Sequence, residues 1–178
     1  CYYRAISTIL FFNGIPVLRT LLLTCACWVM PALAGTIYSQ FPTEIDPHEH
    51  YVFYSHGFIV EGKNPKPVHK TFGVYDFIAV KEALADDSYH LIAYQRPKDT
   101  EPFAFAKKLA ADVEALISAG VAESNISLIG FSRGGALSIP AVNELKRTHI
   151  NLIILAGCAG LIKNHTSVKA YGKVYSIF

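Results

Sequence analysis

Apolar and polar positions along the chain follow two periods in turn, one typical of strands and one typical of helices. Short apolar runs rich in β-branched and aromatic residues have the length and composition of buried strands. They lie at 51–54, 90–94, 126–129 and 150–155, and a further run covers 174–178. Between them, apolar residues recur every three or four positions, which is the spacing of one helical face. The helices predicted in this way cover 75–85, 103–119 and 134–146.

Strands that alternate with amphipathic helices indicate βαβ units, which build a mostly parallel sheet with helices on both faces. The pattern therefore predicts an α/β fold. Residues 35–50 are polar and rich in turn formers, and they predict either a short leading strand or an arm. Gly120 is placed to cap the second helix, whereas Pro140 predicts a kink or a short first turn in the third.

The first 34 residues differ from the rest of the chain. Arg19 precedes an apolar stretch at 21–30, Pro31 interrupts it, and small residues follow. This order is typical of a secretory signal peptide. A membrane anchor is the alternative, but the stretch is shorter than the ~20 apolar residues that a span needs. We therefore expect residues 1–34 to be a signal peptide or an upstream extension and 35–178 to be the folded domain.

A cleaved signal predicts a periplasmic or secreted protein without a stable membrane span.

The composition predicts a folded chain, since 52% of its 178 residues are hydrophobic and only 17% are charged. The net charge of +2 comes from Arg4 and Arg19, so the domain itself is neutral and does not favour a nucleic-acid partner. Cys158 is the one cysteine after residue 34, and we expect it to be buried or paired with a cysteine outside this sequence.

One short motif contains a candidate catalytic serine. Gly130-Phe131-Ser132-Arg133-Gly134 matches G-x-S-x-G, and it directly follows a predicted strand and opens a predicted helix. A sharp strand-to-helix turn of this kind holds a serine in a strained conformation above the sheet, at a helix N-terminus that favours negative charge. The two glycines let the neighbouring strand and helix approach the turn. A strand–turn–helix junction with glycines for packing is the alternative interpretation.

A second motif, in the loop after an earlier predicted strand, supports this interpretation of Ser132. His56, Gly57 and Phe58 follow an earlier strand. Acyl-transfer hydrolases stabilise an oxyanion with two backbone N–H groups, one from the residue after the nucleophile and one from such a loop. We therefore expect Arg133 and Phe58 to supply them, Gly57 to permit the turn, and His56 to be structural rather than a general base.

These two motifs and the order of predicted elements over 51–178 resemble the α/β-hydrolase superfamily, in particular its exported bacterial branch. The resemblance implies a serine hydrolase that forms an acyl-enzyme on Ser132 within a Ser-His-acid triad. It implies no cofactor and no metal. The expected substrate is a small molecule with an ester-like bond, as for a carboxylesterase.

The acid and the histidine of that triad are not identified. Glu144 is the one carboxylate after Ser132, and it lies inside a predicted helix. His149 precedes a strand at the end opposite the expected site, and His165 comes too early in the chain. We expect both partners beyond Phe178, so that this chain is an N-terminal, C-terminally incomplete portion that is inactive alone. A degenerate hydrolase and a triad built on His165 or an upstream histidine are the alternatives.

Three smaller expectations complete the picture. The connection 159–173 has 15 residues, which is too short for a cap domain and predicts an open site. His48-Glu49-His50 lacks a third ligand nearby and is interpreted as solvated surface. Arg96 is expected to form a salt bridge in its loop rather than to contact substrate. The rival functions are a non-catalytic exported domain that binds a ligand or partner and a peptidase or acyltransferase on the same scaffold.

Overall fold

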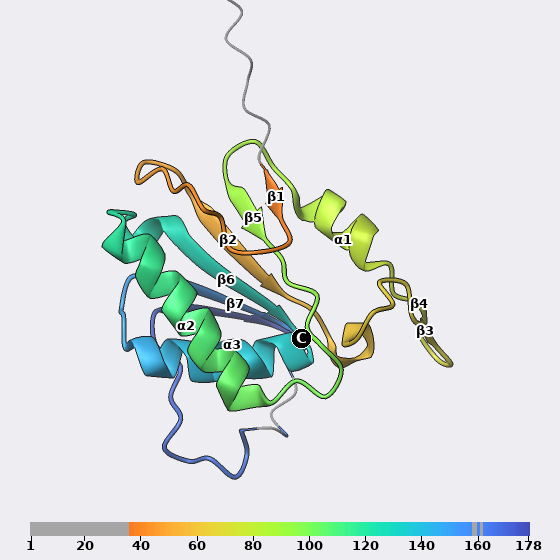
Figure 1. The fold of residues 1–178 in the computed structure, drawn as a ribbon. Coiled ribbons are helices and arrows are strands. Elements are labelled where there is room, and N and C mark those ends of the chain that lie inside the picture. The colour runs from red at the N-terminus through yellow and green to blue at the C-terminus, as the bar shows by residue number, and fades with distance from the viewer. Residues whose placement is uncertain (1–35, 158–159, 161) are drawn as a thin grey trace, which may run out of the picture. The chain divides into compact units, whose positions relative to one another are not determined.

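A six-stranded parallel sheet forms the centre of the fold. The computed structural model describes residues 36–157, 160 and 162–178. The strand order is β1-β5-β2-β6-β7-β8, and each adjacent pair is parallel (Figure 1). The strands are β1 Ile37–Tyr38, β2 Tyr51–Ser55, β5 His90–Ile92, β6 Ile126–Phe131, β7 Asn151–Leu155 and β8 Lys173–Ile177. The expected α/β class with a mostly parallel sheet is confirmed.

Helices cover both faces of the sheet. Three α-helices are described, α1 Phe77–Leu84, α2 Pro102–Ser118 and α3 Arg133–Leu145. Helices α2 and α3 lie together on one face (Figure 1), while Phe77 of α1 packs in a separate cluster on the other. Strand β2 shows the two faces clearly, because Phe53 belongs to the first cluster and Tyr54 to the second.

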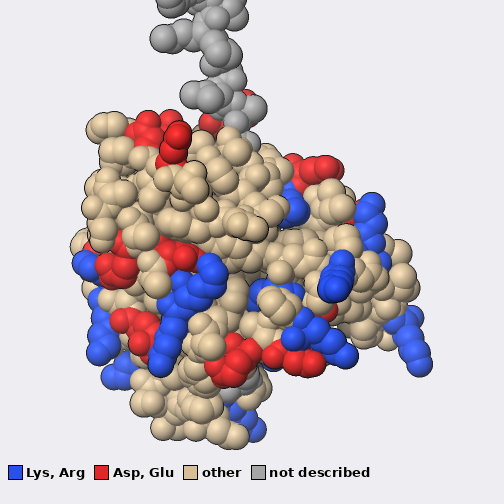
Figure 2. All heavy atoms as spheres, in the orientation of Figure 1, with Lys and Arg blue, Asp and Glu red and all other residues tan. Residues whose placement is uncertain are grey.

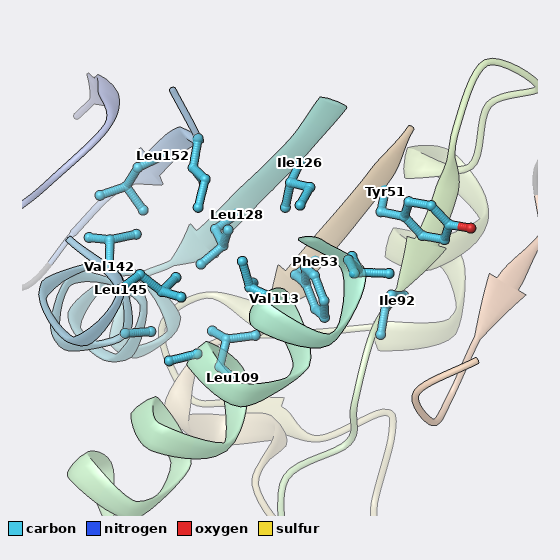
Figure 3. Packing of buried hydrophobic residues seen from close by; sticks show 14 of the residues in the cluster. Tyr51, Phe53, Ile92, Leu109, Val113, Ile126, Leu128, Val142, Leu145 and Leu152 are labelled. Atoms are coloured by element: carbon cyan, nitrogen blue, oxygen red, sulfur yellow. The ribbon is translucent and has the colours of Figure 1, made fainter. Parts of the chain in front are cut away.

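The larger core lies between the sheet and the α2–α3 pair. Figure 3 shows Leu109 and Val113 of α2 pointing toward Phe53 and Leu128 of the central strands. These four side chains are at most 1% exposed. Burial of a large apolar side chain stabilises the fold by about 1.5–3 kcal/mol, so this face supplies most of the hydrophobic stabilisation of the described domain.

The helix ends follow local sequence signals. Glu101 caps α2, with its carboxylate accepting from the N–H groups of Phe103 and Ala104. Gly120 adopts φ +100° directly after that helix, as a C-cap requires. Helix α3 continues through Pro140, so the expected short first turn is wrong. Ser138 Oγ donates to the carbonyl of Gly134 at 2.9 Å inside the same helix.

Two segments differ from the simple alternation. Of the two alternatives for residues 35–50, the leading strand is correct, since β1 pairs with β5 at the sheet edge. The loop after β2 contains a short 3-10 helix, η1 Phe58–Val60, and an antiparallel hairpin of β3 Val68–His69 and β4 Gly73–Val74. This β3–β4 hairpin lies beside α1 in Figure 1. At the other edge of the sheet, β8 is exposed along its whole length.

Candidate functional site

The serine of the G-x-S-x-G motif lies at the junction between β6 and α3. Its backbone has φ 51° and ψ −115°, a region that residues other than glycine rarely adopt. The N–H of Ser132 donates to the carbonyl of Leu155 at 2.8 Å, which anchors the turn to β7. The strained turn expected at Ser132 is therefore present, and its strain is balanced by the sheet around it.

The two motif glycines are required by close backbone approach. A Cβ on Gly130 would lie 2.5 Å from the Cα of Gly135, and a Cβ on Gly134 would lie 1.8 Å from the carbonyl oxygen of Ser55. Real Cβ atoms essentially never come within 3.0 Å of such atoms. Helix α3 can therefore begin against β2 and β6 only with glycine at these positions.

The His56-Gly57-Phe58 loop lies directly beside this turn. Strands β2 and β6 are parallel neighbours with Ser55 opposite Gly130, so the segments that leave them emerge at the same end of the sheet. A Cβ on Gly57 would be 3.8 Å from Cβ of Ser132. The fold thus brings together the two motifs that the sequence analysis singled out.

The two expected oxyanion donors begin helical segments near Ser132. Phe58 is the first residue of η1, and Arg133 is the first residue of α3. The N–H groups in the first turn of a helix have no partner inside that helix. The Arg133 guanidinium lies over the Phe58 ring, 5.2 Å from its centroid, so the two segments are in contact.

His56 is a buried, neutral link between two loops. Its side chain is inaccessible to solvent, and the N–H of Arg96 donates to its Nε2 at 3.0 Å. The ring proton is therefore on Nδ1, which donates to the carbonyl of Gly57 at 2.8 Å. Burial, with a smaller contribution from the charge of Arg96, lowers the pKa of His56 to about 3. With both ring nitrogens engaged, His56 holds the loop in place and does not accept a proton at neutral pH.

A buried ion-pair network connects the same loops to the serine turn. Glu61 Oε1 accepts from Nε of Arg133 at 2.8 Å and from Nε of Arg96 at 3.4 Å. Arg96 also donates to the carbonyl of His56 at 2.5 Å, and its own side chain is fully buried. Burial lowers the pKa of Arg96 to about 10, so it stays charged at neutral pH. The salt-bridge interpretation of Arg96 is confirmed.

Glu61 is the residue of this network that the sequence analysis missed. It lies in a loop of mixed composition after β2, with no motif around it. Its partners, Arg96 and Arg133, are distant in the sequence, so periodicity could not reveal the contact. The available signal in the sequence was a carboxylate soon after the His56-Gly57-Phe58 motif.

A cavity opens beside the serine. It has a volume of about 340 Å³, which is within the ~300–1,000 Å³ range typical of ligand sites. Most of its walls are apolar or aromatic, and Ser132 contributes to them. The lining residues are Gly57, Phe58, Ile59, His69, Phe72, Gly73, Val74, Tyr75, Phe131 and Ser132.

The three remaining candidates are all exposed. His149 is exposed and close to Glu123, which precedes β6, so it lies at the amino end of the strands. His165 is exposed and its ring contacts Phe103 at the start of α2. Glu144 is exposed on α3 near its C-terminus.

Some expectations concern other parts of the molecule. His48 and His50 are exposed, and within the described ranges no three His, Cys, Asp or Glu side chains are grouped as a metal site would need. Cys158 and the predicted signal segment 1–34 lie outside the described residues. Among residues 36–157, 160 and 162–178, no helix is long and apolar enough to cross a membrane. Acidic and basic side chains are intermingled on the face shown in Figure 2.

Together these features define an α/β protein with a strained serine at the carboxyl end of a central parallel strand. Comparison with known proteins finds no matching family model, curated protein or solved structure.

Proposed function

We propose that this chain belongs to an exported serine hydrolase with the α/β-hydrolase fold, which cleaves carboxylic ester-like bonds. The observation that carries the proposal is the backbone of Ser132, at φ 51° and ψ −115° in the wall of an apolar cavity. Such strain costs of order 1–3 kcal/mol and is usually found at functional sites. A packing junction alone would not require a serine there, because glycine adopts the same conformation without strain.

In the proposed reaction, Ser132 Oγ bonds to the carbonyl carbon of the ester, and the bond from that carbon to the alcohol oxygen breaks. The alcohol leaves with the proton that the serine loses. Water then attacks the acyl-enzyme, which releases the acid and restores the hydroxyl. The N–H groups of Phe58 and Arg133 would stabilise the oxyanion of each tetrahedral intermediate.

In this proposal neither the base nor its orienting acid is assigned to a described residue. His56 is excluded as the base because its Nε2 already accepts from Arg96. His149 lies at the opposite end of the strands, and Glu144 is exposed far along α3. A serine hydroxyl without a base is a weak nucleophile, so we expect the isolated chain to be inactive.

In this proposal no cap domain follows β7 over the cavity beside Ser132, because the connection 159–173 is too short to form one. The nearest cover is the β3–β4 hairpin, which contributes one wall. An open site suits small soluble esters, whose access requires no movement of a separate domain.

A fluorophosphonate probe tests the proposal, because it reacts covalently with an activated serine but not with an ordinary serine hydroxyl. In the native full-length protein we expect one adduct at Ser132, located by peptide mass spectrometry, and turnover of 4-nitrophenyl butyrate. The Ser132→Ala variant should lose both. Ser124→Ala is the matched control, since Ser124 is exposed and precedes β6, at the end of that strand opposite Ser132, and it should lose neither.

Absence of an adduct in folded full-length protein would contradict the hydrolase proposal. It would favour the other candidate, a non-catalytic exported domain that binds a ligand in the same cavity. An adduct at a serine other than Ser132 would likewise overturn the assignment of the nucleophile.

A further inference from the structure

The cavity beside Ser132 has an outer wall that the core of the fold does not require. This wall is the β3–β4 hairpin, from which His69, Phe72, Gly73 and Val74 reach the cavity. Its apolar side chains are largely open to solvent, with Phe72 84% and Val74 63% exposed. Exposed apolar side chains clustered around a pocket are typical of a binding surface rather than of a packing surface.

The hairpin is held in a defined conformation although it is exposed. Thr71 and Phe72 both donate their N–H groups to Nδ1 of His69, at 3.1 and 3.3 Å. The His69 and Phe72 rings stack at 4.8 Å with an angle of 24° between them. Gly73 provides the positive φ of +75° that brings the chain back into β4. Phe72 is therefore positioned before any ligand arrives.

The base of the hairpin is fixed to the body of the molecule. The N–H of Tyr75 donates to the carbonyl of Pro67, and the N–H of Phe77 donates to the carbonyl of Pro65, both at 2.9 Å. The hydroxyl of Tyr75 is within 2.5 Å of the Tyr54 hydroxyl, which is buried. With its hydroxyl engaged there, Tyr75 offers mainly its ring to the cavity.

The inner wall is aromatic as well. The Phe131 ring lies 5.8 Å from that of Tyr75, with the planes tilted by 35°. Phe131 precedes Ser132, and Phe58 on the other side is 59% exposed. The cavity therefore has apolar surfaces on the inner side, at the outer wall and next to Ser132, which also lines it.

We propose that this cavity binds the apolar group attached to the scissile ester, an aliphatic chain of several carbons or a single ring, and that Phe72 sets its size. The inference rests on the proposed function only in assigning the bound group to an ester. A volume of about 340 Å³ is enough for such a group. The bound apolar group is attached to either the acyl side or the alcohol side of the ester. The experiment below distinguishes these two possibilities.

The test measures binding without turnover, in the full 178-residue chain carrying Ser132→Ala. Methyl acetate, methyl butyrate and methyl hexanoate form one series, and butyl acetate and hexyl acetate form the other. Each is titrated while the backbone amide signals of Gly57 and Gly73 are followed by NMR. We expect binding to tighten about two- to fourfold per added methylene, in one series more steeply than in the other.

Phe72→Ala should weaken binding of the hexyl or hexanoyl ester by roughly three- to tenfold and leave methyl acetate unchanged. Phe178→Ala is the matched control, because Phe178 is fully exposed and does not line the cavity. Phe72→Leu keeps an apolar side chain in the wall and should retain most of the affinity. That result would show that the effect of Phe72→Ala is not caused by loss of folding.

The result that overturns the inference is an affinity that does not change with chain length, or one that Phe72→Ala and Phe178→Ala alter equally. These outcomes are distinct from failure of the proposed function. Chain-length dependence in a protein whose Ser132 never reacts with the fluorophosphonate would support the cavity and refute the hydrolase.

Discussion

At the scale of single residues, the conformation of Ser132 is costly and local sequence preference does not explain it. Serine has no intrinsic preference for φ 51°, and glycine would occupy the position without strain. The neighbours hold it there, because Gly130 and Gly134 admit the close contacts and Leu155 accepts its N–H. The residue is therefore kept in place at the expense of stability.

Comparison of Ser132→Gly with Ser132→Ala measures the free energy of unfolding that the strained backbone costs. Both remove the hydroxyl, but only glycine relieves the backbone. We expect Ser132→Gly to be more stable than Ser132→Ala by about 1 kcal/mol, after allowing for the greater freedom of glycine in the unfolded chain. Urea unfolding followed by circular dichroism measures the difference. Equal stability of the two variants would show that the turn is unstrained.

At the scale of elements, the amino end of α3 approaches β2 and β6 so closely that side-chain atoms have no room. A Cβ at Gly134 would lie 1.8 Å from the Ser55 carbonyl oxygen and 2.8 Å from that of His56. Backbone atoms of a central strand cannot move aside as the end of a flexible side chain can. The contact therefore sets the distance between the serine turn and the His56-Gly57-Phe58 loop.

Gly134→Ala should consequently destabilise the fold by at least about 3 kcal/mol, the upper range for overpacking. Gly160→Ala is the control, since nothing lies within 4 Å of a Cβ at that position, and it should change stability by less than about 0.5 kcal/mol. Thermal unfolding of both variants checks this. Similar midpoints for the two would contradict the close approach.

Elements with strong periodicity were predictable, and those made by tertiary contact were not. The stripe of Leu109, Val113 and Leu116 determines α2 because each residue faces the core. The β3–β4 hairpin could not be predicted in this way, since its strands have two residues each and expose their side chains. For the site, the glycines and Ser132 were visible as a local motif, whereas Glu61 depends on contacts with distant residues.

At the scale of the whole molecule, a network of buried polar groups joins loops from three parallel strands. His56 follows β2, Arg96 follows β5 and Arg133 follows β6, and all three are linked by hydrogen bonds or through Glu61. Removing one partner from such a network leaves a buried polar group unsatisfied. The carboxyl end of the sheet therefore behaves as one unit, and its stability depends on the ionisation of its members.

The buried His56 makes the free energy of unfolding depend on pH. Its pKa is about 3 in the folded protein and near 6.5 when unfolded, so below pH 6.5 the unfolded chain binds a proton that the folded one does not. Stability is then greatest above pH 6.5 and decreases as pH falls toward 3. From pH 7 to pH 5 we expect a loss of about 1–2 kcal/mol from this residue.

His56→Gln tests the assignment, since its amide oxygen can accept from the N–H of Arg96 and does not titrate. Urea unfolding at pH 7 and pH 5 should show a smaller decrease in that variant than in the wild type. His48→Gln, at an exposed position, is the control and should keep the full decrease. A decrease of the same size in all three proteins would assign the effect to other groups.

The bond between Ser132 and Leu155 also has a consequence during synthesis. Ribosomes add about 5–20 residues per second, so the carbonyl that anchors the serine turn is made one to a few seconds after the serine itself. Strands β2 and β6 can pair before then, because both are already complete. A nascent chain can therefore pair its central strands first, and the turn at Ser132 reaches its final anchored conformation only after β7 joins them.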